Sequence, residues 1–490
     1  MLVITLRWFM IGWLLAAAAL ASAQTLTDPT LQVREITGGL DAPTTMAFIA
    51  PNDVLILQKN NGHVRRVLNG TLLPDPVLDL AVDRASERGL LGIAVHPSFP
   101  TAPFVYLYYT ASSTGEDTAG DPPPAAHRID RFTWNGSALV EPTLISALPA
   151  LPGPNHDGGV ITFGPDGKLY AVIGDLNHRG QLQNVSDGPE PDDTSVILRL
   201  NDDGSIPSDN PFFAQGGNLA KYYAYGIRNS FGLSFDPVTH KLWMTENGPD
   251  TYDEINVVEP GFNSGWVPLM GPEARDPQGL ADLFQIAGSH YRDPAFSWFE
   301  PVAPTFIIFL NTRHLGERYH NQVLVGDITT GTLYHFTPNA DRDGFLFQSA
   351  GLADVVVDPG DDVQELIFGT GFGGISDAKV GPDGRLYVLS FRLGKLFVIS
   401  PLPSTVHGTV QDGATGTGLA GVRVHARRLD PAPNLRVGTS TDDAGSYVLN
   451  NLEPGLYRLL FWHGGYRPQR RQVELPAGAV VQLDIQLLPR

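Results

Sequence analysis

The sequence predicts an all-β chain, a six-bladed β-propeller followed by a small antiparallel β-sandwich. Three observations support this fold class: a hairpin pattern that recurs along most of the chain, a scarcity of helix signals, and a change of composition after Ser400. With 490 residues the chain is too long for one ordinary hydrophobic core, unless a repeat distributes that core around a ring. Its 53 glycines and 40 prolines are typical of many short strands joined by turns.

The recurring unit is an apolar pair, a turn rich in Pro, Asp, Gly or Asn, and then alternating apolar residues. A turn of the Pro-Asp-Gly type between two segments of period two predicts a β-hairpin. Copies lie at residues 46–57, 93–109, 163–172, 235–244, 306–336 and 380–389. About six copies at irregular spacings indicate six propeller blades. The alternative is a pair of β-sandwiches, whose hairpins need not share a motif.

The chain divides near residue 400. We assign residues 33–400 to the propeller, Pro401-Leu-Pro-Ser to a linker, and residues 405–490 to the sandwich, where apolar residues alternate cleanly. This last segment resembles the carboxypeptidase regulatory-like (transthyretin-like) module. The resemblance implies an accessory role in folding or adhesion rather than chemistry.

The N-terminus has the composition of an export signal. Arg7 supplies a positive charge, residues 11–20 are apolar, and Ala21-Ser22-Ala23 fits a cleavage site before Gln24. The alternative is a membrane anchor, but the apolar run is short for about 30 Å of hydrocarbon. We therefore expect a signal peptide over residues 1–23 and a secreted or periplasmic mature protein with no membrane span.

Composition excludes several partners and chemistries. Acidic residues outnumber basic ones by 52 to 33, a net charge of −19, which argues against nucleic acid and anionic membranes as partners. The chain has no cysteine, so a metal ion would need oxygen or imidazole ligands. No serine nucleophile elbow, P-loop or dinucleotide fingerprint is present.

His156 is the first candidate for chemistry. It lies in Pro152-Gly-Pro-Asn-His-Asp-Gly-Gly, just before an expected strand. An imidazole suits proton abstraction from a hydroxyl near neutral pH, and Asn155 or Asp157 could orient it. The alternative is a turn histidine that bonds to a carbonyl.

Arg228 and Asn229 are the second candidate, between two expected strands. A guanidinium near a propeller axis can hold a carboxylate or a quinone oxygen by paired hydrogen bonds. The alternative is an arginine that ties blades together through backbone carbonyls.

The turn Glu246-Asn-Gly-Pro-Asp is the third. With Asp250, Asp253 and Glu254 it concentrates hard oxygen ligands of the kind that bind Ca²⁺, although its spacing is not that of an EF-hand. The alternative is a simple acidic turn.

These motifs occur together in an order that resembles the glucose/sorbosone dehydrogenase family, the soluble pyrroloquinoline-quinone (PQQ) sugar dehydrogenases. The resemblance runs from about Val33 to Ser400 and rests on several motifs. They are Glu87-Arg-Gly-Leu-Leu-Gly-Ile-Ala-Val-His-Pro, His156-Asp-Gly-Gly, Ile173-Gly-Asp, Gly226-Ile-Arg-Asn, Glu246-Asn-Gly-Pro and Asp253-Glu-Ile-Asn.

The resemblance implies a PQQ- and calcium-dependent enzyme that oxidises an aldose sugar to a lactone, with hydride passing to the quinone and then to an unknown electron acceptor. His156 would be the general base, and Arg228 would bond the quinone oxygens beside Asn229. Glu87 and Gln181 would contact the cofactor. The carbonyls of Gly248 and Pro249 would hold Ca²⁺.

The sequence departs from the family at three cations that face the carboxylates of PQQ. An Arg-x-Arg pair is replaced by Gly374-Ile-Ser-Asp, and a lysine by Thr329. Candidate replacements are Arg179, Lys379 and Arg392. The departure leaves open a propeller that binds a glycan or protein without redox chemistry, and fold analogy alone suggests a calcium-dependent lactone hydrolase.

Overall fold

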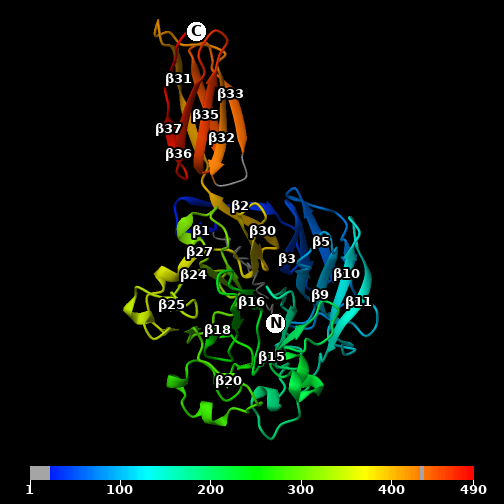
Figure 1. Cartoon of the computed structure of the whole chain (residues 1–490). Helices are drawn as coiled ribbons and strands as arrows, with labels where there is room; N and C mark the ends of the chain where they lie inside the picture. The colour runs from blue at the N-terminus through cyan, green and yellow to red at the C-terminus, as the bar shows by residue number, and fades with distance from the viewer. Residues whose placement is uncertain (1–22, 431–434) are drawn as a thin grey trace, which may run out of the picture.

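The computed structural model describes residues 23–430 and 435–490. Within them, the chain consists of strands and short 3₁₀ turns, which confirms the all-β prediction (Figure 1). The expected signal peptide lies outside the described residues, apart from Ala23. No helix in the described part of the chain is long and apolar enough to cross a membrane.

Six sheets form the six blades that the repeats predicted. The first two blades contain β3 (Pro43–Ala50), β4 (Asp53–Gln58), β5 (His63–Leu68), β6 (Thr71–Leu72) and β7 (Leu78–Asp79), then β8 (Leu90–Val95), β9 (Phe104–Ala111), β10 (Ala126–Trp134) and β11 (Leu139–Leu148). The third contains β12 (Ile161–Phe163), β13 (Leu169–Ile173), β14 (Val196–Leu200), β15 (Tyr222–Tyr225), β19 (Phe262–Asn263) and β20 (His290–Tyr291).

The remaining blades also take strands from distant parts of the chain. The fourth contains β16 (Gly232–Phe235), β17 (Leu242–Glu246), β18 (Asp253–Val258), β21 (Phe296–Trp298) and β26 (Val356–Val357). The fifth contains β22 (Pro304–Phe309), β23 (Val323–Asp327), β24 (Leu333–Pro338), β25 (Phe345–Leu346), β27 (Ile367–Thr370) and β1 (Thr25–Leu26). The sixth contains β28 (Ile375–Val380), β29 (Leu386–Ser390), β30 (Lys395–Pro401) and β2 (Leu31–Thr37).

Eight short 3₁₀ turns interrupt the loops between these strands. They are η1 (Gln181–Gln183), η2 (Phe213–Gln215), η3 (Gly217–Lys221), η4 (Glu273–Arg275), η5 (Gly279–Asp282), η6 (Glu317–Tyr319), η7 (Ala350–Leu352) and η8 (Gln364–Leu366).

The Pro-Asp-Gly motif is explained by the hairpin between the innermost and second strands of a blade. In the third blade Gly167 has φ +73°, a backbone conformation that favours glycine. The Asp166 carboxylate accepts a hydrogen bond from the hydroxyl of Tyr170 at 3.0 Å. The sixth blade repeats this pair, with Tyr387 donating to Asp383 at 2.9 Å. The motif therefore encodes both the turn and the hydrogen bond that fixes it.

The hydrophobic core is divided among the interfaces between neighbouring blades. Six separate clusters of buried apolar residues each join two adjacent blades, and a seventh fills the C-terminal domain. For example, Tyr106 of the second blade packs with Leu169 of the third. This division explains how 490 residues fold without one oversized core.

The ring is closed by the N-terminal strand. β2 pairs with β30 in antiparallel register from Leu31 opposite Pro401 to Thr37 opposite Leu396. At the innermost strands the Asp377 carboxylate accepts hydrogen bonds from the Thr45 hydroxyl at 2.7 Å and from the Met46 backbone at 3.0 Å. Strands of the propeller thus extend from Thr25 to Pro401.

The C-terminal domain is a sandwich of two sheets. One contains β31 (Ser404–Asp412), β34 (Ser446–Leu452), β37 (Val480–Gln482) and β38 (Ile485–Leu487), with β37 and β38 parallel to β31. The other is antiparallel throughout and contains β32 (Arg423–Asp430), β33 (Arg436–Ser440), β35 (Gly455–Trp462) and β36 (Gln469–Leu475).

The sandwich stands on the propeller beside β2 and β30 (Figure 1). Glu453 joins the two domains, because it accepts hydrogen bonds from Arg385 of the propeller at 2.5 Å and from the buried Arg428 of the sandwich at 2.6 Å. Burial raises the pKa of Glu453, but the hydrogen bond from Arg385 and nearby positive charges outweigh it and hold that pKa below its usual value.

Candidate functional site

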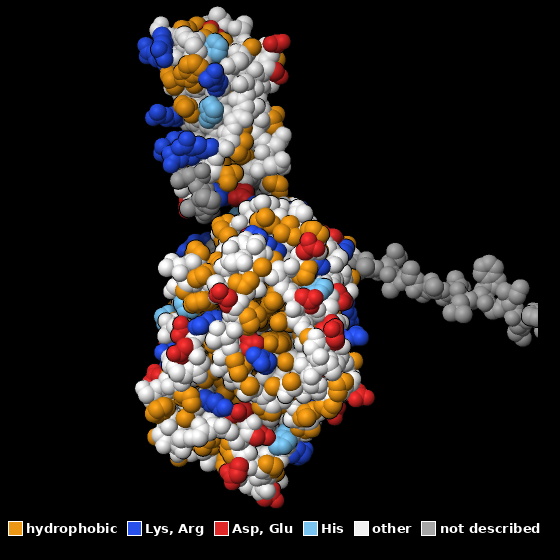
Figure 2. All heavy atoms as spheres, turned by 90° about the vertical axis from the view of Figure 1, so that its right-hand side faces the viewer, with side chains coloured by type: hydrophobic (Ala, Val, Ile, Leu, Met, Phe, Trp, Pro, Cys, Tyr) orange, Lys and Arg blue, Asp and Glu red, His pale blue; other side chains and the backbone are white. Residues whose placement is uncertain are grey.

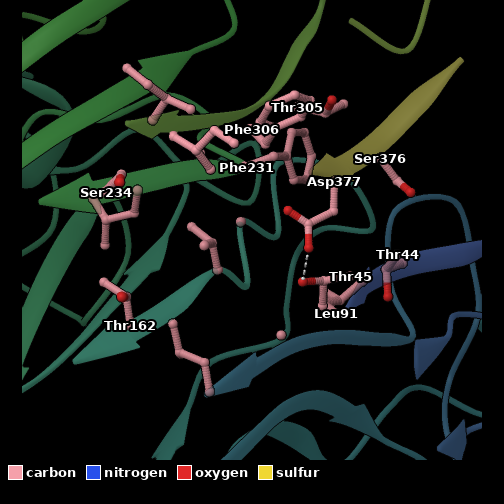
Figure 3. A pocket seen from close by; sticks show the side chains of 18 of the residues that line it. Thr44, Thr45, Leu91, Thr162, Phe231, Ser234, Thr305, Phe306, Ser376 and Asp377 are labelled. Atoms are coloured by element: carbon pink, nitrogen blue, oxygen red, sulfur yellow. Dashed lines mark hydrogen bonds between the residues drawn. The ribbon is translucent and has the colours of Figure 1, made fainter. Parts of the chain in front are cut away.

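The six innermost strands converge on a cavity of about 1230 Å³. Hydroxyl side chains line it from five of these strands, as Figure 3 shows: Thr44, Thr162, Ser234, Thr305 and Ser376. Of the seven residues that the family resemblance assigned to catalysis, cofactor or metal, six line this cavity: Glu87, His156, Arg228, Asn229, Gly248 and Pro249. Loops separated by up to about 160 positions therefore meet at one end of the propeller axis.

His156 forms a pair with Asp175, which the end of β13 presents. The imidazole Nδ1 lies 2.6 Å from Asp175 Oδ1. Asp175 is buried and also accepts hydrogen bonds of 2.6 Å from the Asn177 backbone and from the Trp266 indole. A carboxylate accepts only, so Nδ1 carries the proton and Nε2 is left as the acceptor. This is the arrangement of a general base held by a carboxylate.

The sequence-based choice of orienting residue was wrong. Asp157 is fully buried and its carboxylate lies 2.9 Å from Nε2 of His127, while Asn155 accepts a hydrogen bond from Ser86. Asp175 belongs to the Ile173-Gly-Asp motif, but the motif does not show that it lies beside His156. The two side chains meet because β13 runs antiparallel to β12, so that the end of β13 lies beside the loop that holds His156.

Glu87 ties the loop of His156 to that of Asn229. Its Oε2 accepts hydrogen bonds from the His156 backbone at 2.7 Å and from the Asn229 side chain at 3.0 Å. Burial, with the nearby charge of Asp157, raises the pKa of Glu87. The carboxylate thus has a structural role in addition to any contact with a ligand.

Arg228 lies over the Trp266 ring at 5.2 Å and donates from Nη1 to the Asn247 carbonyl at 2.8 Å. Its backbone donates to Glu246 at 2.6 Å. Burial lowers the pKa of Arg228, although the charges of Asp175 and Glu246 oppose that shift. The guanidinium is therefore held, partly buried, at the wall of the cavity.

Three buried polar atoms of residues that line this cavity have no hydrogen-bond partner: Arg228 Nε, Asn229 Oδ1 and Asn247 Oδ1. Buried polar groups in native proteins are nearly always paired. A cluster of such atoms at one cavity indicates a place for polar groups of a ligand.

The Gly248-Pro249 turn offers carbonyl oxygens but not carboxylates. The Gly248 backbone donates to Asp253 at 2.9 Å, and Asp253 also accepts from Val302 and Ala303 at 2.6 Å each. Within residues 23–430 and 435–490 neither the Gly248 nor the Pro249 carbonyl accepts a hydrogen bond, and no group of three acidic or histidine side chains could hold a metal ion.

The expectation of a dense carboxylate site for Ca²⁺ at this turn is therefore wrong, since Asp253 is engaged by backbone donors and Glu254 is buried beside Asn256. An ion here would be held by carbonyl, water and ligand oxygens, a mixture that Ca²⁺ accepts.

Gln181 lies elsewhere. It begins a 3₁₀ turn, its backbone donates to the Pro189 carbonyl at 3.0 Å, and its side chain lines a second, smaller pocket with Asn218 and Phe284. The predicted role of Gln181 in contacting the same ligand as His156 is not supported by this placement.

The wall opposite His156 has few cations. Thr329, Ser376 and Asp377 line it, and Lys379 also lines the cavity but pairs with Asp377 at 3.1 Å. Arg392 donates to the Thr329 carbonyl at 3.1 Å. Arg179 does not line the cavity.

Lys59, which no sequence motif indicated, lines the cavity near Glu87. Burial lowers its pKa, although the charges of Asp157 and Glu87 oppose that shift. Lys379 and Arg392 thus lie beside positions at which the family's cations are missing, whereas Lys59 adds a cation on the Glu87 side of the cavity.

The buried pair Glu246 and Glu254, on adjacent strands, makes stability depend on pH. Burial, and then the charge of Glu246, raise the pKa of Glu254 to about 8. The folded state therefore keeps a proton that the unfolded chain releases near pH 4, so this group costs stability as the pH rises from about 4 to 8. We expect Glu254→Gln to raise the unfolding temperature at pH 8 by about 5 °C and to change it little at pH 4.5.

Thermal unfolding followed by circular dichroism checks this prediction. The exposed Glu300 offers a matched control, since Glu300→Gln makes the same chemical change without burial. An equal effect of both variants, or an effect of Glu254→Gln that does not depend on pH, would contradict the assignment.

Comparison with known proteins agrees with this architecture. The Glucose / Sorbosone dehydrogenase family profile matches residues 40–397, and the Carboxypeptidase regulatory-like domain profile matches residues 405–488. The aldose sugar dehydrogenase YliI of Escherichia coli (strain K12) is 27% identical over 400 residues, which cover 79% of this chain and 98% of the relative. The soluble aldose sugar dehydrogenase of Escherichia coli in its apo form has a crystal structure with a TM-score of 0.59 at 25% identity, covering 76% of this chain and 100% of that chain.

Two shorter matches lie in the same region. The quinoprotein glucose dehydrogenase B of Acinetobacter calcoaceticus is 30% identical over 281 residues, 53% of this chain and 57% of the relative. The human Hedgehog-interacting protein is 27% identical over 221 residues, 40% of this chain and 30% of the relative.

Proposed function

Because the chain belongs to the glucose/sorbosone dehydrogenase family, we propose that it is an exported, PQQ- and calcium-dependent dehydrogenase that oxidises aldose sugars to lactones. The observation that carries this proposal is the Asp175–His156 pair, which shares one cavity with the guanidinium of Arg228. The composition of residues 1–23, which is that of an export signal, supports a periplasmic or secreted location. A sugar and a separate electron acceptor are the expected partners.

The residues present fit an anionic, planar quinone cofactor. Arg228, Asn229 and Asn247 line the cavity and each has an unpartnered polar atom, and the ring of Trp266 holds the Arg228 guanidinium in place. Arg228 and Asn229 would hold the quinone oxygens, Lys59 and Lys379 would offset carboxylate charge, and the Gly248-Pro249 carbonyls would contribute to Ca²⁺. PQQ, when bound, supplies the electron-accepting quinone.

The protein's own contribution is proton transfer and orientation. His156 Nε2 accepts the proton of the anomeric hydroxyl, while Asp175 keeps Nδ1 protonated and stabilises the imidazolium that results. Glu87 holds the His156 loop against Asn229, which fixes the base relative to the guanidinium.

Calorimetric titration of the purified protein with PQQ, with and without Ca²⁺, tests the cofactor, and dye reduction with a panel of aldoses tests the reaction. We expect Ca²⁺-dependent binding followed by dye reduction. No heat and no absorbance change on adding PQQ would overturn the proposal.

The replacement of the family's cations by Thr329, Ser376 and Asp377 favours a second candidate, a propeller that binds a glycan or protein without redox chemistry. Similarity to the Hedgehog-interacting protein is consistent with such a use of the fold. Sugar binding that is indifferent to PQQ and Ca²⁺, with no dye reduction, would establish this alternative.

We assign Asp175 the role of positioning the imidazole of His156, and we expect this role to be separable from any role in folding. We expect Asp175→Asn to lower kcat about a hundredfold, because an amide no longer fixes the tautomer of His156, and to change the affinity for PQQ less than threefold. A shifted pH–rate profile would distinguish this effect from general damage. His178 lies 3.0 Å from Asp192 outside the cavity, so Asp192→Asn is the matched control and should leave kcat unchanged.

A further inference from the structure

The C-terminal domain differs from the propeller in the kind and the balance of its charges. Residues 401–490 contain nine basic residues, all arginine, and seven acidic ones, whereas the remainder holds 33 − 9 = 24 basic and 52 − 7 = 45 acidic residues. The absence of lysine is informative, since arginine offers a planar fork that pairs with carboxylates through two hydrogen bonds.

Five of these arginines share the outer face of the sheet β33-β32-β35-β36, which we call the arginine face. Strand register arranges this face in three rows that recede from the propeller. The first row aligns Arg436, Arg427, Arg458 and Gln472; the second Gly438, His425, Leu460 and Arg470; the third Ser440, Arg423 and Trp462. In Figure 2, the Lys and Arg side chains of the upper domain gather along one side, with apolar and histidine side chains between them.

The first row of arginines destabilises the fold when no ligand is bound. Arg427 stands directly opposite Arg436 on one side and Arg458 on the other, and like charges placed opposite each other destabilise a sheet. None of the five arginines forms an ion pair with a carboxylate of residues 23–430 or 435–490. The nearest acidic positions, Asp430 and Glu474, lie one row closer to the propeller, on either side of Leu456. A row of unneutralised arginines indicates that an external anion supplies the missing charge.

An exposed aromatic ring completes the face. Trp462 is 40% exposed, and the Arg423 guanidinium lies 5.3 Å from its ring centre. The apolar face of a sugar ring packs well against such an indole, with the guanidinium beside it to meet a carboxylate.

We propose that the arginine face binds an acidic polysaccharide, a polymer of uronic acid sugars, and so holds the propeller close to a carboxylated glycan. The three rows contain only two apolar side chains, Leu460 and Trp462, too few for insertion into a lipid surface. A duplex carries a charge about every 1.7 Å and would be repelled by the rest of the chain, since residues 1–400 have a net charge of 24 − 45 = −21. A uronate polymer, with one carboxylate per sugar, meets less of that repulsion.

Affinity electrophoresis and calorimetry with polygalacturonate, using the full mature chain, test this site. We expect binding that weakens as the salt concentration rises. The affinity for polygalacturonate should fall at least tenfold in the double variant Arg427→Gln/Arg458→Gln and several-fold in Trp462→Ala. Pullulan, a neutral glucan, should not bind. Because these variants are remote from the propeller cavity, PQQ binding should not change.

Two adjacent residues supply a matched pair. Arg470 lies on the arginine face and Arg471 on the opposite side of the same edge strand, so Arg470→Gln should weaken binding and Arg471→Gln should not. Equal losses of affinity in both variants would show that binding depends only on the net charge of the domain, and would overturn the proposal. So would binding to phosphatidylglycerol vesicles or to duplex DNA with no binding to polygalacturonate.

Discussion

Replacing His156 by alanine is expected to lower kcat for dye-linked sugar oxidation by about a thousandfold or more. A positioned general base contributes roughly 10²- to 10⁴-fold, and His156 is the only histidine beside Asp175 in the described part of the cavity. The imidazole is bonded on one side to a buried carboxylate, so its removal eliminates a base that the protein holds in a fixed orientation. Affinity for PQQ should change by only a few-fold, because the cofactor's polar contacts are assigned to other residues.

The measurement is steady-state dye reduction in the holoenzyme, combined with a PQQ titration of the same variant. His178→Ala serves as control, since that imidazole also faces an aspartate but lies outside the cavity. Turnover retained within tenfold in His156→Ala would remove His156 from the mechanism.

Replacing Arg228 is expected to have its largest effect on cofactor binding. A charge-assisted hydrogen bond contributes about 1.5–3 kcal/mol, so loss of two such bonds in Arg228→Ala should raise the Kd for PQQ by roughly 10²-fold or more. Arg228→Lys keeps the charge but not the planar fork, and should raise the Kd by about tenfold. Fluorescence or absorbance titration with PQQ measures both.

The exposed Arg313, which pairs with Glu317 at 2.8 Å, is the matched control for loss of one positive charge. Circular dichroism should show that Arg228→Ala remains folded, since the side chain makes one hydrogen bond to the Asn247 carbonyl. Unchanged PQQ affinity in a folded Arg228→Ala variant would exclude the assigned role.

The architecture was predictable because it depends on short-range signals. Pro-Asp-Gly turns specify hairpins locally, and their repetition gives the number of blades. The strand that closes the ring was not predicted in this way. β2 joins the sixth blade by pairing with β30, and no local sequence pattern encodes that pairing.

Site residues were predictable where they lie in a recognisable sequence motif. They were not predictable where only the fold brings them to the site. His156, Arg228 and Asn229 lie in recognisable sequences and do meet at one cavity. Lys59 reaches the cavity, and Asp175 reaches His156, only through long-range contacts, so no sequence pattern pairs them with these residues. Gln181 was predicted to contact the cofactor, but the structure places it in a 3₁₀ turn that lines a separate pocket.

The pairing of β2 with β30 also determines when the protein can finish folding. Leu31 and Pro401 are 401 − 31 = 370 positions apart, so a ribosome working at 5–20 residues per second needs roughly 20–70 s to deliver the second partner after the first. During that interval the nascent chain exposes an unpaired strand edge, which is a site for misassociation. Completion of the ring is therefore a late event, and a chaperone that shields this edge would be expected to increase the yield of native protein.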